Sequence, residues 1–96
     1  MSVTVVLPQV LRADCDGAAR ADVPVDAASG VPLRDLLDEL ARRYPRVDRR
    51  LRDDQGRLRR YINVFVGADE CRALAGLDTA VADGTEVRVL PSVAGG

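Results

Sequence analysis

The fold of this sequence is decided by residues 31–45, which read VPLRDLLDELARRYP. Large apolar side chains occupy positions i, i+3, i+4, i+7 and i+11 of this stretch: Leu33, Leu36, Leu37, Leu40 and Tyr44. This spacing predicts a helix that buries one apolar stripe in a core, and it does not indicate a cofactor-binding segment. Pro32 suits the first helical position, and Pro45 ends the helix because the residue before a proline is pushed out of the α region.

Residues 3–7 are expected to form a strand ahead of this helix. Their sequence, Val-Thr-Val-Val-Leu, is apolar and rich in β-branched residues, which favour strands. Alternation along the strand places Val3, Val5 and Leu7 on the inward side. Pro8 then ends the strand.

The chain is next expected to turn back on itself as a hairpin. Residues 13–19 hold the turn, with Asp16 and Gly17 at its tip, because Asp-Gly is typical of tight turns. Residues 20–25 predict a weaker second strand. Pro24 confines this strand to an edge of the sheet or shortens it, since proline lacks the N–H that a central strand donates.

The second half of the chain predicts mostly strands. Residues 46–60 hold few apolar side chains, so we expect a short helix and a loop that turns at residues 54–56. Residues 61–66 give the strongest strand pattern, and residues 71–74 are expected as a short strand in which Cys71 is a half-buried thiol. Residues 85–90 predict the last strand, with Val87 and Val89 inward and Arg88 and Leu90 outward.

The predicted element order is therefore β–β–α–β–β–β. A hairpin, a crossing helix and further strands indicate an α+β fold with one main helix packed across a mixed sheet. The last strand is expected beside the first and parallel to it, because the helix supplies the crossover that parallel neighbours need.

Composition excludes several classes of protein. Ninety-six residues with 47% hydrophobic content predict one globular domain, and no apolar run is long enough to span a membrane. Residues 1–6 lack the basic start of a signal peptide, so a cytoplasmic protein is expected. The chain has no His, and its two cysteines are too few for a zinc cluster. We therefore expect no metal site, no catalytic residues and no enzyme activity.

Charge is distributed unevenly along the chain. Residues 42–60 carry nine arginines against three acids, whereas the net charge of the whole sequence is −1. One interpretation is a nucleic-acid-binding segment, which predicts salt-sensitive binding. Only Tyr44 and Tyr61 flank the segment, however, so no base-stacking platform is evident. A solvated helix face and loop, with no nucleic-acid partner, is the expectation.

The sequence ends in Leu-Pro-Ser-Val-Ala-Gly-Gly, residues 90–96. Pro91 should stop the last strand, which divides the chain into a folded domain at residues 1–90 and a flexible tail at residues 91–96. Six extended residues reach roughly 20 Å. Gly95 and Gly96 make the tip thin, which suits insertion into a narrow site on another protein.

Four stretches together resemble the β-grasp, ubiquitin-like sulfur carriers of the MoaD/ThiS/CysO group. They are VTVVLPQVLR (residues 3–12), YINVFV (61–66), ADGTEV (82–87) and LPSVAGG (90–96). The form of the tail and the long loop at residues 45–60 look most like carriers of the CysO type. The resemblance implies a β-grasp fold for residues 1–90.

The resemblance also implies a function for the tail. A partner enzyme would use ATP to adenylate the Gly96 carboxylate, and a sulfur nucleophile would convert it to a thiocarboxylate that donates sulfur in biosynthesis. The carrier would bind no cofactor itself. Residues inserted into the partner's active site would be Pro91, Ser92, Val93, Ala94 and Gly95.

Three classes of partner follow from the same resemblance. They are an adenylating activating enzyme, a sulfur-accepting biosynthetic enzyme, and a metalloprotease that releases product from the tail. Cysteine synthesis is the first expectation for the acceptor, and molybdopterin, a thiosugar or another thio-natural product stays open.

A docking face for these partners is expected beside the tail. Phe65, Arg88 and Leu90 point outward from the strands at 61–66 and 85–90, and exposed Phe and Leu are typical interface anchors. The alternative is that Phe65 only covers the sheet edge.

A second function has the same activation step. The chain would then be a ubiquitin-like protein modifier, joined through Gly96 to lysines of target proteins. All fourteen basic residues are arginine, so chains linked through the protein's own lysines are excluded, while single attachment is not.

Overall fold

The computed structural model describes residues 2–25 and 30–91. Its strands are β1 (Ser2–Val6), β2 (Arg20–Pro24), β3 (Val31–Pro32), β4 (Ile62–Val66), β5 (Asp69–Glu70), β6 (Ala80–Val81) and β7 (Glu86–Pro91). Its helices are α1 (Gln9–Arg12), α2 (Leu33–Arg43) and α3 (Pro45–Leu51). Three short 3₁₀ turns follow at Ala13–Cys15, Cys71–Ala73 and Gly76–Asp78.

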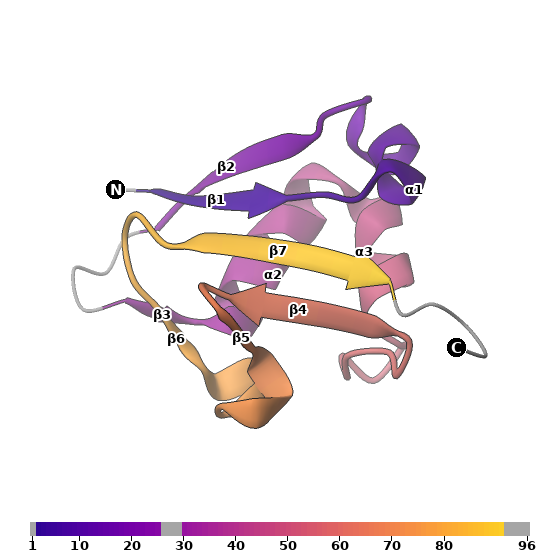
Figure 1. Ribbon diagram of the computed structural model, residues 1–96. Helices are drawn as coiled ribbons and strands as arrows, with labels where there is room; N and C mark the ends of the chain where they lie inside the picture. Colours follow the sequence, from indigo (N-terminus) through magenta and orange to yellow (C-terminus); the bar gives the residue numbers. More distant parts are fainter. Residues whose placement is uncertain (1, 26–29, 92–96) are drawn as a thin grey trace.

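Five strands form a mixed sheet in the order β2-β1-β7-β4-β5 (Figure 1). β1 pairs antiparallel with β2 and parallel with β7, and β4 pairs antiparallel with β7. The predicted parallel pairing of the last strand with the first is confirmed. The predicted edge position of β2, which carries Pro24, is confirmed as well.

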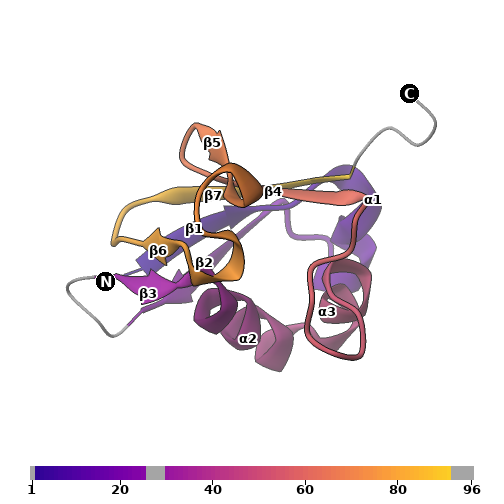
Figure 2. The same ribbon diagram turned by 90° about the horizontal axis from the view of Figure 1, so that it is seen from below.

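Helices α2 and α3 cover one face of this sheet, and the core lies between the two layers (Figure 2). The apolar stripe of α2 is buried as predicted, with Leu33, Leu36, Leu37 and Leu40 each at most 1% exposed. Inward side chains of the strands meet it from the sheet: Val3, Val5, Val23, Ile62, Val64, Val87 and Val89. This packing accounts for the α+β architecture expected from the periodicity.

The start of α2 differs from the prediction by one residue. Pro32 is not the first helical residue, because it ends β3 and pairs with Ala80 of β6, with φ −60° and ψ 146°. The strands β3 and β6 were not predicted. The approach of β3 to β6 requires a glycine at position 30, where φ is +96° and an added Cβ would lie 2.9 Å from the Val81 carbonyl oxygen.

The segment before β2 is helical, not only a hairpin turn. α1 and the Ala13–Cys15 turn occupy most of the connection, and they bury Leu11 and Cys15. The expected tip is nevertheless correct, since Asp16 and Gly17 both have positive φ, 55° and 81°. A four-residue helix is too short to leave a periodic pattern in the sequence, so α1 could not be predicted from hydrophobic spacing.

The strand expected at residues 71–74 is wrong. Cys71–Ala73 forms a 3₁₀ turn, because the Glu70 side chain accepts a hydrogen bond from the Arg72 N–H and caps it. Cys71 is fully buried, not half-buried on a strand. The short helix predicted in residues 46–60 is α3, and the turn at residues 54–56 is present.

Within the described ranges, no helix has both the length and the apolar character needed to cross a bilayer. Among the same residues, no group of three or more His, Cys, Asp or Glu side chains is arranged to hold a metal ion.

Candidate functional site

The site predicted for partner docking lies on the sheet face opposite the helices. β4 and β7 pair so that Phe65 lies opposite Arg88 and Asn63 lies opposite Leu90. Their neighbours Val64, Val87 and Val89 are buried. Strand alternation therefore turns Phe65, Arg88 and Leu90 to the outer face, as the sequence pattern indicated.

Phe65 and Arg88 are in direct contact across the two strands. The Arg88 guanidinium carbon lies 5.6 Å from the centroid of the Phe65 ring, which is the geometry of a cation–π pair. Glu86 sits two residues before Arg88 on the same face, with its Oε1 atom 4.0 Å from Arg88 Nε. Arg20 of β2 approaches Glu86 at 3.5 Å. The outer face thus carries one aromatic ring within a row of alternating charges.

The face continues to the point where β7 ends. Leu90 is 42% exposed, and Tyr61 at the entrance to β4 is 53% exposed. Tyr61 was not among the expected docking residues, although alternation places it on the same strand face as Phe65. Two large, exposed side chains therefore stand at this end of the sheet.

Pro91 is the last described residue and lies opposite Ile62. The final strand is therefore one residue longer than expected. The cause is local: β1 pairs with β7 only as far as Arg88, so Pro91 stands where β7 has one neighbour. Such a position tolerates a residue without an N–H.

Ser92, Val93, Ala94, Gly95 and Gly96 lie outside the described residues. Their predicted insertion into a partner, and the predicted covalent site at Gly96, stay predictions. The same holds for the division of the chain at residue 90.

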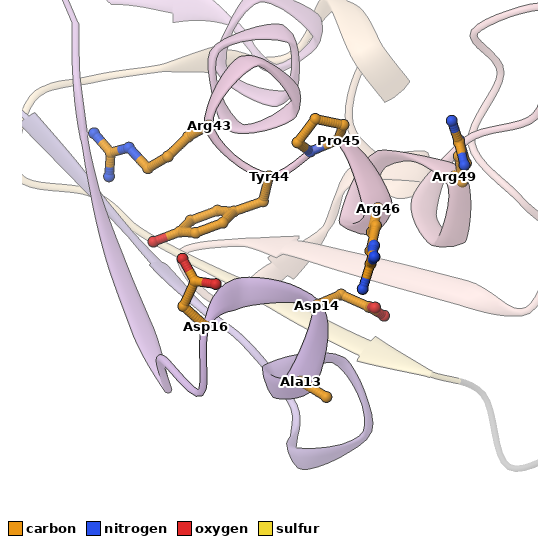
Figure 3. A pocket seen from close by; sticks show the side chains of 8 residues that line it. All are labelled: Ala13, Asp14, Asp16, Arg43, Tyr44, Pro45, Arg46 and Arg49. Carbon is orange, nitrogen blue, oxygen red and sulfur yellow. The ribbon is translucent and has the colours of Figure 1, made fainter.

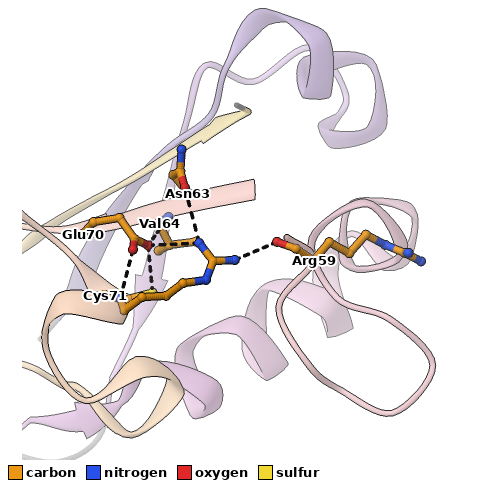
Figure 4. A network of polar contacts seen from close by, with 6 residues as sticks. Arg59, Asn63, Val64, Glu70 and Cys71 are labelled. Carbon is orange, nitrogen blue, oxygen red and sulfur yellow. Dashed lines mark hydrogen bonds and ion pairs between the residues drawn. The ribbon is translucent and has the colours of Figure 1, made fainter. Parts of the chain in front are cut away.

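A polar network holds the start of β4 and the loop before it (Figure 4). Arg72 donates to Asn63 Oδ1 at 3.3 Å and to the Arg59 carbonyl at 2.8 Å. Glu70 Oε2 accepts from Arg72 at 3.4 Å and from the Cys71 thiol at 3.3 Å. Through Arg72, these contacts join the turn after β5 to the loop before β4. No sequence motif predicted them.

Neither cysteine is a reactive thiol. Burial raises the pKa of Cys71 to about 11, and the hydrogen bond and charge of Glu70 act in the same direction. Burial, with Asp14 and Asp16 nearby, raises the pKa of Cys15 to about 11. A protonated, buried thiol is a poor nucleophile, so the structure supports no cysteine chemistry at neutral pH.

Comparison with known proteins decides the family. The profile of the ThiS family matches residues 13–96. The chain belongs to the ThiS family. The sulfur carrier protein CysO of Mycobacterium tuberculosis is 38% identical over 98 residues, which are 100% of either protein. The resemblance noted from the sequence is therefore confirmed.

Solved structures place this ThiS-family chain in the β-grasp, ubiquitin-like fold. A crystal structure of the Amycolatopsis orientalis BexX/CysO complex matches with a TM-score of 0.85 and 32% identity, covering 98% of this chain and 99% of that one. The crystal structure of SAMP1 from Haloferax volcanii matches with a TM-score of 0.82 and 30% identity, covering 100% of both chains. The predicted fold class is confirmed.

Proposed function

We propose that this ThiS-family chain is a sulfur carrier whose C-terminal Gly96 carries the sulfur as a thiocarboxylate. The observation that supports this most strongly is the match to CysO, which extends over the full length of both sequences at 38% identity. The match includes the stretch after Pro91, where the chain ends in Gly-Gly.

The proposed chemistry requires no acid, base or metal from the carrier itself. A carboxylate is ionised at neutral pH and is a poor electrophile. On a partner enzyme, a Gly96 carboxylate oxygen attacks the α-phosphorus of ATP and displaces pyrophosphate, giving an acyl adenylate. A sulfide or persulfide sulfur then attacks the acyl carbon and expels AMP. A persulfide donor first gives an acyl disulfide. A thiol then attacks the donor's sulfur and breaks the S–S bond, which forms a disulfide between thiol and donor and leaves the thiocarboxylate on Gly96.

This division of labour agrees with the residues described above. The sequence has no His, and both thiols are buried and protonated. The carrier is accordingly proposed to be a protein substrate and not an enzyme, with ATP bound by its activating enzyme.

We propose the outer face of β4 and β7 as the docking surface for that enzyme. Phe65, Arg88 and Leu90 lie on it, next to the strand end from which Pro91 leads into the tail. Pro91, Ser92, Val93, Ala94 and Gly95 would then reach into the partner, and the two glycines would pass where a side chain would obstruct.

The proposed destination of the sulfur is cysteine biosynthesis, since the matched relatives are named CysO. A sulfur-accepting enzyme would take the thiocarboxylate, and a metalloprotease would release the product from Gly96. Molybdopterin and thiosugar pathways are the other destinations, and the acceptor enzyme makes the choice.

A second candidate is a protein modifier joined through Gly96 to lysines. The likeness to SAMP1 of Haloferax volcanii, which is a small archaeal modifier protein, favours it. The two functions share activation and differ in product.

The experiment that tests both is the intact mass of the protein purified from its native host, with the terminus protected from hydrolysis. A species heavier by the oxygen-to-sulfur difference at Gly96 is expected. Higher-mass adducts that resist reducing agent, with no sulfur species, would favour the modifier. A variant lacking Gly95 and Gly96 is the control, and it should show neither product. If the wild type shows neither product after incubation with ATP, sulfide and a candidate activating enzyme, both functions fail.

A further inference from the structure

Four arginines form a row at the end of the molecule where the last strand finishes. Arg46 and Arg49 lie on α3, and Arg59 and Arg60 precede β4. We call these four residues the arginine row. Figure 2 shows α3 in the layer of helices and the loop before β4 rising from it to the sheet, where the start of β4 lies opposite the end of β7.

Three members of the row, Arg46, Arg49 and Arg60, differ from most arginines of the protein in having no acid partner among the described residues. Most other arginines are neutralised by a carboxylate: Arg20 by Glu86, Arg34 by Asp78, Arg42 by Glu39, Arg50 by Asp14, Arg52 by Asp38 and Asp48, Arg57 by Asp53, and Arg72 by Glu70. Arg12, Arg43 and Arg59 also lack a carboxylate, but each donates to a backbone carbonyl. Among residues 2–25 and 30–91, Arg46, Arg49 and Arg60 have neither kind of partner, although acids outnumber basic residues in the sequence.

The four residues are connected through the pockets that they line: Arg46 and Arg49 line one, Arg49 and Arg59 a second, and Arg59 and Arg60 a third. Arg46 and Arg49 are three residues apart, so they share one side of α3, and both line an open pocket against Ala13 and Asp14 (Figure 3). Arg59 Nε donates to the Arg49 carbonyl at 2.9 Å, which ties the loop to the helix. Val47 and Leu51 anchor the other side of α3 in the core.

The row also borders the exit of the tail. Arg60 is followed by the exposed Tyr61 and then by Ile62, which lies opposite Pro91. Any protein that takes up the residues after Pro91 must approach this end of the sheet. Exposed, unpaired guanidinium groups there create a local positive potential that attracts and orients a negatively charged partner.

We infer that the arginine row is a second docking surface, which binds an acidic protein surface bordering the channel that receives the tail. The inference rests on the proposed function and adds to it, because Arg46 and Arg49 lie on α3, which covers the face of the sheet opposite Phe65 and Arg88. Its occupant is a row of Asp or Glu side chains, and its role is to speed and orient the encounter.

A protein suits the row better than a nucleic acid does. Asp14 and Asp16 line the same pocket as Arg46, and Asp54 lies in the loop beside Arg59. These carboxylates would repel a continuous phosphate backbone, whereas a protein can place single acids opposite single arginines. The aromatic side chains beside the row are Tyr44, which lines the pocket, and Tyr61, which follows Arg60. They flank the arginines in the sequence and do not alternate with them, so they form no track on which successive bases would stack.

The test compares two triple variants of the full chain that lose the same charge. One is Arg46→Gln/Arg49→Gln/Arg60→Gln, which leaves Arg59 and its bond to α3 in place. The matched control is Arg20→Gln/Arg34→Gln/Arg42→Gln, which removes exposed arginines that already have acid partners. The probe is a fluorescein-labelled peptide of about ten glutamates, followed by anisotropy at ~50 and ~300 mM salt.

We expect the wild type and the control to bind the peptide, and the row variant to bind it about tenfold more weakly. Amide shifts in a ¹H–¹⁵N spectrum should cluster at residues 46–49 and 59–61. Equal loss in both triple variants, or shifts spread over the surface, would overturn the inference. Tighter binding of a single-stranded DNA of equal charge at the same residues would also overturn it, in favour of a nucleic-acid ligand.

The peptide assay requires neither ATP nor Gly96. A negative result in that assay would therefore contradict the arginine row alone, whereas the intact-mass measurement tests the carrier function. In a reconstituted activation reaction, the row variant should raise the KM for the carrier and leave kcat unchanged. An unchanged KM would remove the link between the row and the partner that takes up the tail.

Discussion

Arg88 holds its guanidinium carbon 5.6 Å from the centre of the Phe65 ring, on the opposite residue of the neighbouring strand. The pair fixes the ring on the outer face of the sheet. Because Phe65 is partly buried and Arg88 is exposed, the aromatic surface is presented in one orientation and does not need to be ordered on binding.

Replacing Phe65 by alanine should weaken docking and spare the fold. We expect the KM for the carrier in the activation reaction to rise about tenfold or more, since central aromatic anchors dominate interfaces. The kcat should change little, because the reacting carboxylate is untouched. Leu74→Ala is the matched control, since Leu74 is 47% exposed and lies in the turn region after β5. Equal KM values for the two variants would show that the outer face does not dock the enzyme.

Gly30→Ala should destabilise the protein markedly. The backbone there has φ +96°, and the new Cβ would meet the Val81 carbonyl oxygen at 2.9 Å. Conformational strain and the clash should together cost about 2–3 kcal/mol in the free energy of unfolding. Urea denaturation followed by circular dichroism measures it.

Gly56→Ala separates the two effects in that experiment. Gly56 has φ +79°, but nothing lies within 4 Å of an added Cβ. Gly56→Ala should therefore lower the free energy of unfolding only by the cost of backbone strain, about 1 kcal/mol. If both variants lose the same stability, the close approach of β3 and β6 is not the cause at position 30.

Arg52 should be the arginine that contributes most to stability. Its side chain is only 9% exposed, and it bonds Asp38 of α2 at 2.8 Å and Asp48 of α3 at 2.7 Å. Arg52→Ala should lower the free energy of unfolding by about 2 kcal/mol, because Asp48 loses its partner and the two helices lose a shared clamp. Arg57→Ala, which removes an exposed pair with Asp53, should change it by less than about 1 kcal/mol. A larger loss of stability in Arg57→Ala than in Arg52→Ala would show that the contacts of Arg52 with Asp38 and Asp48 do not stabilise the fold.

The two thiols should react slowly until the protein unfolds. With pKa values of about 11, Cys15 and Cys71 should react with iodoacetamide at pH 8 about a hundredfold more slowly than a free thiol. Mass spectrometry in the presence and absence of urea measures the rates. Rapid labelling of the folded protein would contradict the burial of either residue.

The same pKa shifts predict a loss of stability in alkali. A raised thiol pKa contributes stability that is fully present below the unfolded value, about 8.5, and is lost as the pH rises towards 11. The free energy of unfolding should therefore fall between pH 8.5 and 10.5. Cys15→Ala/Cys71→Ala should flatten this decline, and an unchanged slope would assign it to other groups.

The sequence was sufficient to predict the elements that bury a repeating pattern. The stripe of α2 and the alternation in β1, β4 and β7 each leave a periodic signal, so their faces and the parallel pairing of β7 with β1 were predicted correctly. α1 and the pair β3–β6 were missed because elements of two to four residues are too short for a period and are held by distant contacts.

The candidate site was predictable to a similar degree. Alternation alone placed Phe65, Arg88 and Leu90 outward, whereas the cation–π contact depends on strand register. The excess of arginines at residues 42–60 is visible in the sequence, but which of them lack an acid is not. Arg52 and Arg57 each pair with an aspartate four residues earlier, a spacing that is visible in the sequence. The pairs of Arg50 with Asp14 and of Arg52 with Asp38 form only through tertiary contacts.

The central position of β7 has a mechanical consequence. β7 is hydrogen-bonded to β1 on one side and to β4 on the other. Under the proposed function, a partner that draws in the residues after Pro91 would pull along the strand axis. The load would then fall on both ladders in shear, where many hydrogen bonds resist it together. A terminal strand at the sheet edge would peel away one bond at a time. The sheet thus lets the chain end be gripped tightly without unravelling the domain that carries it.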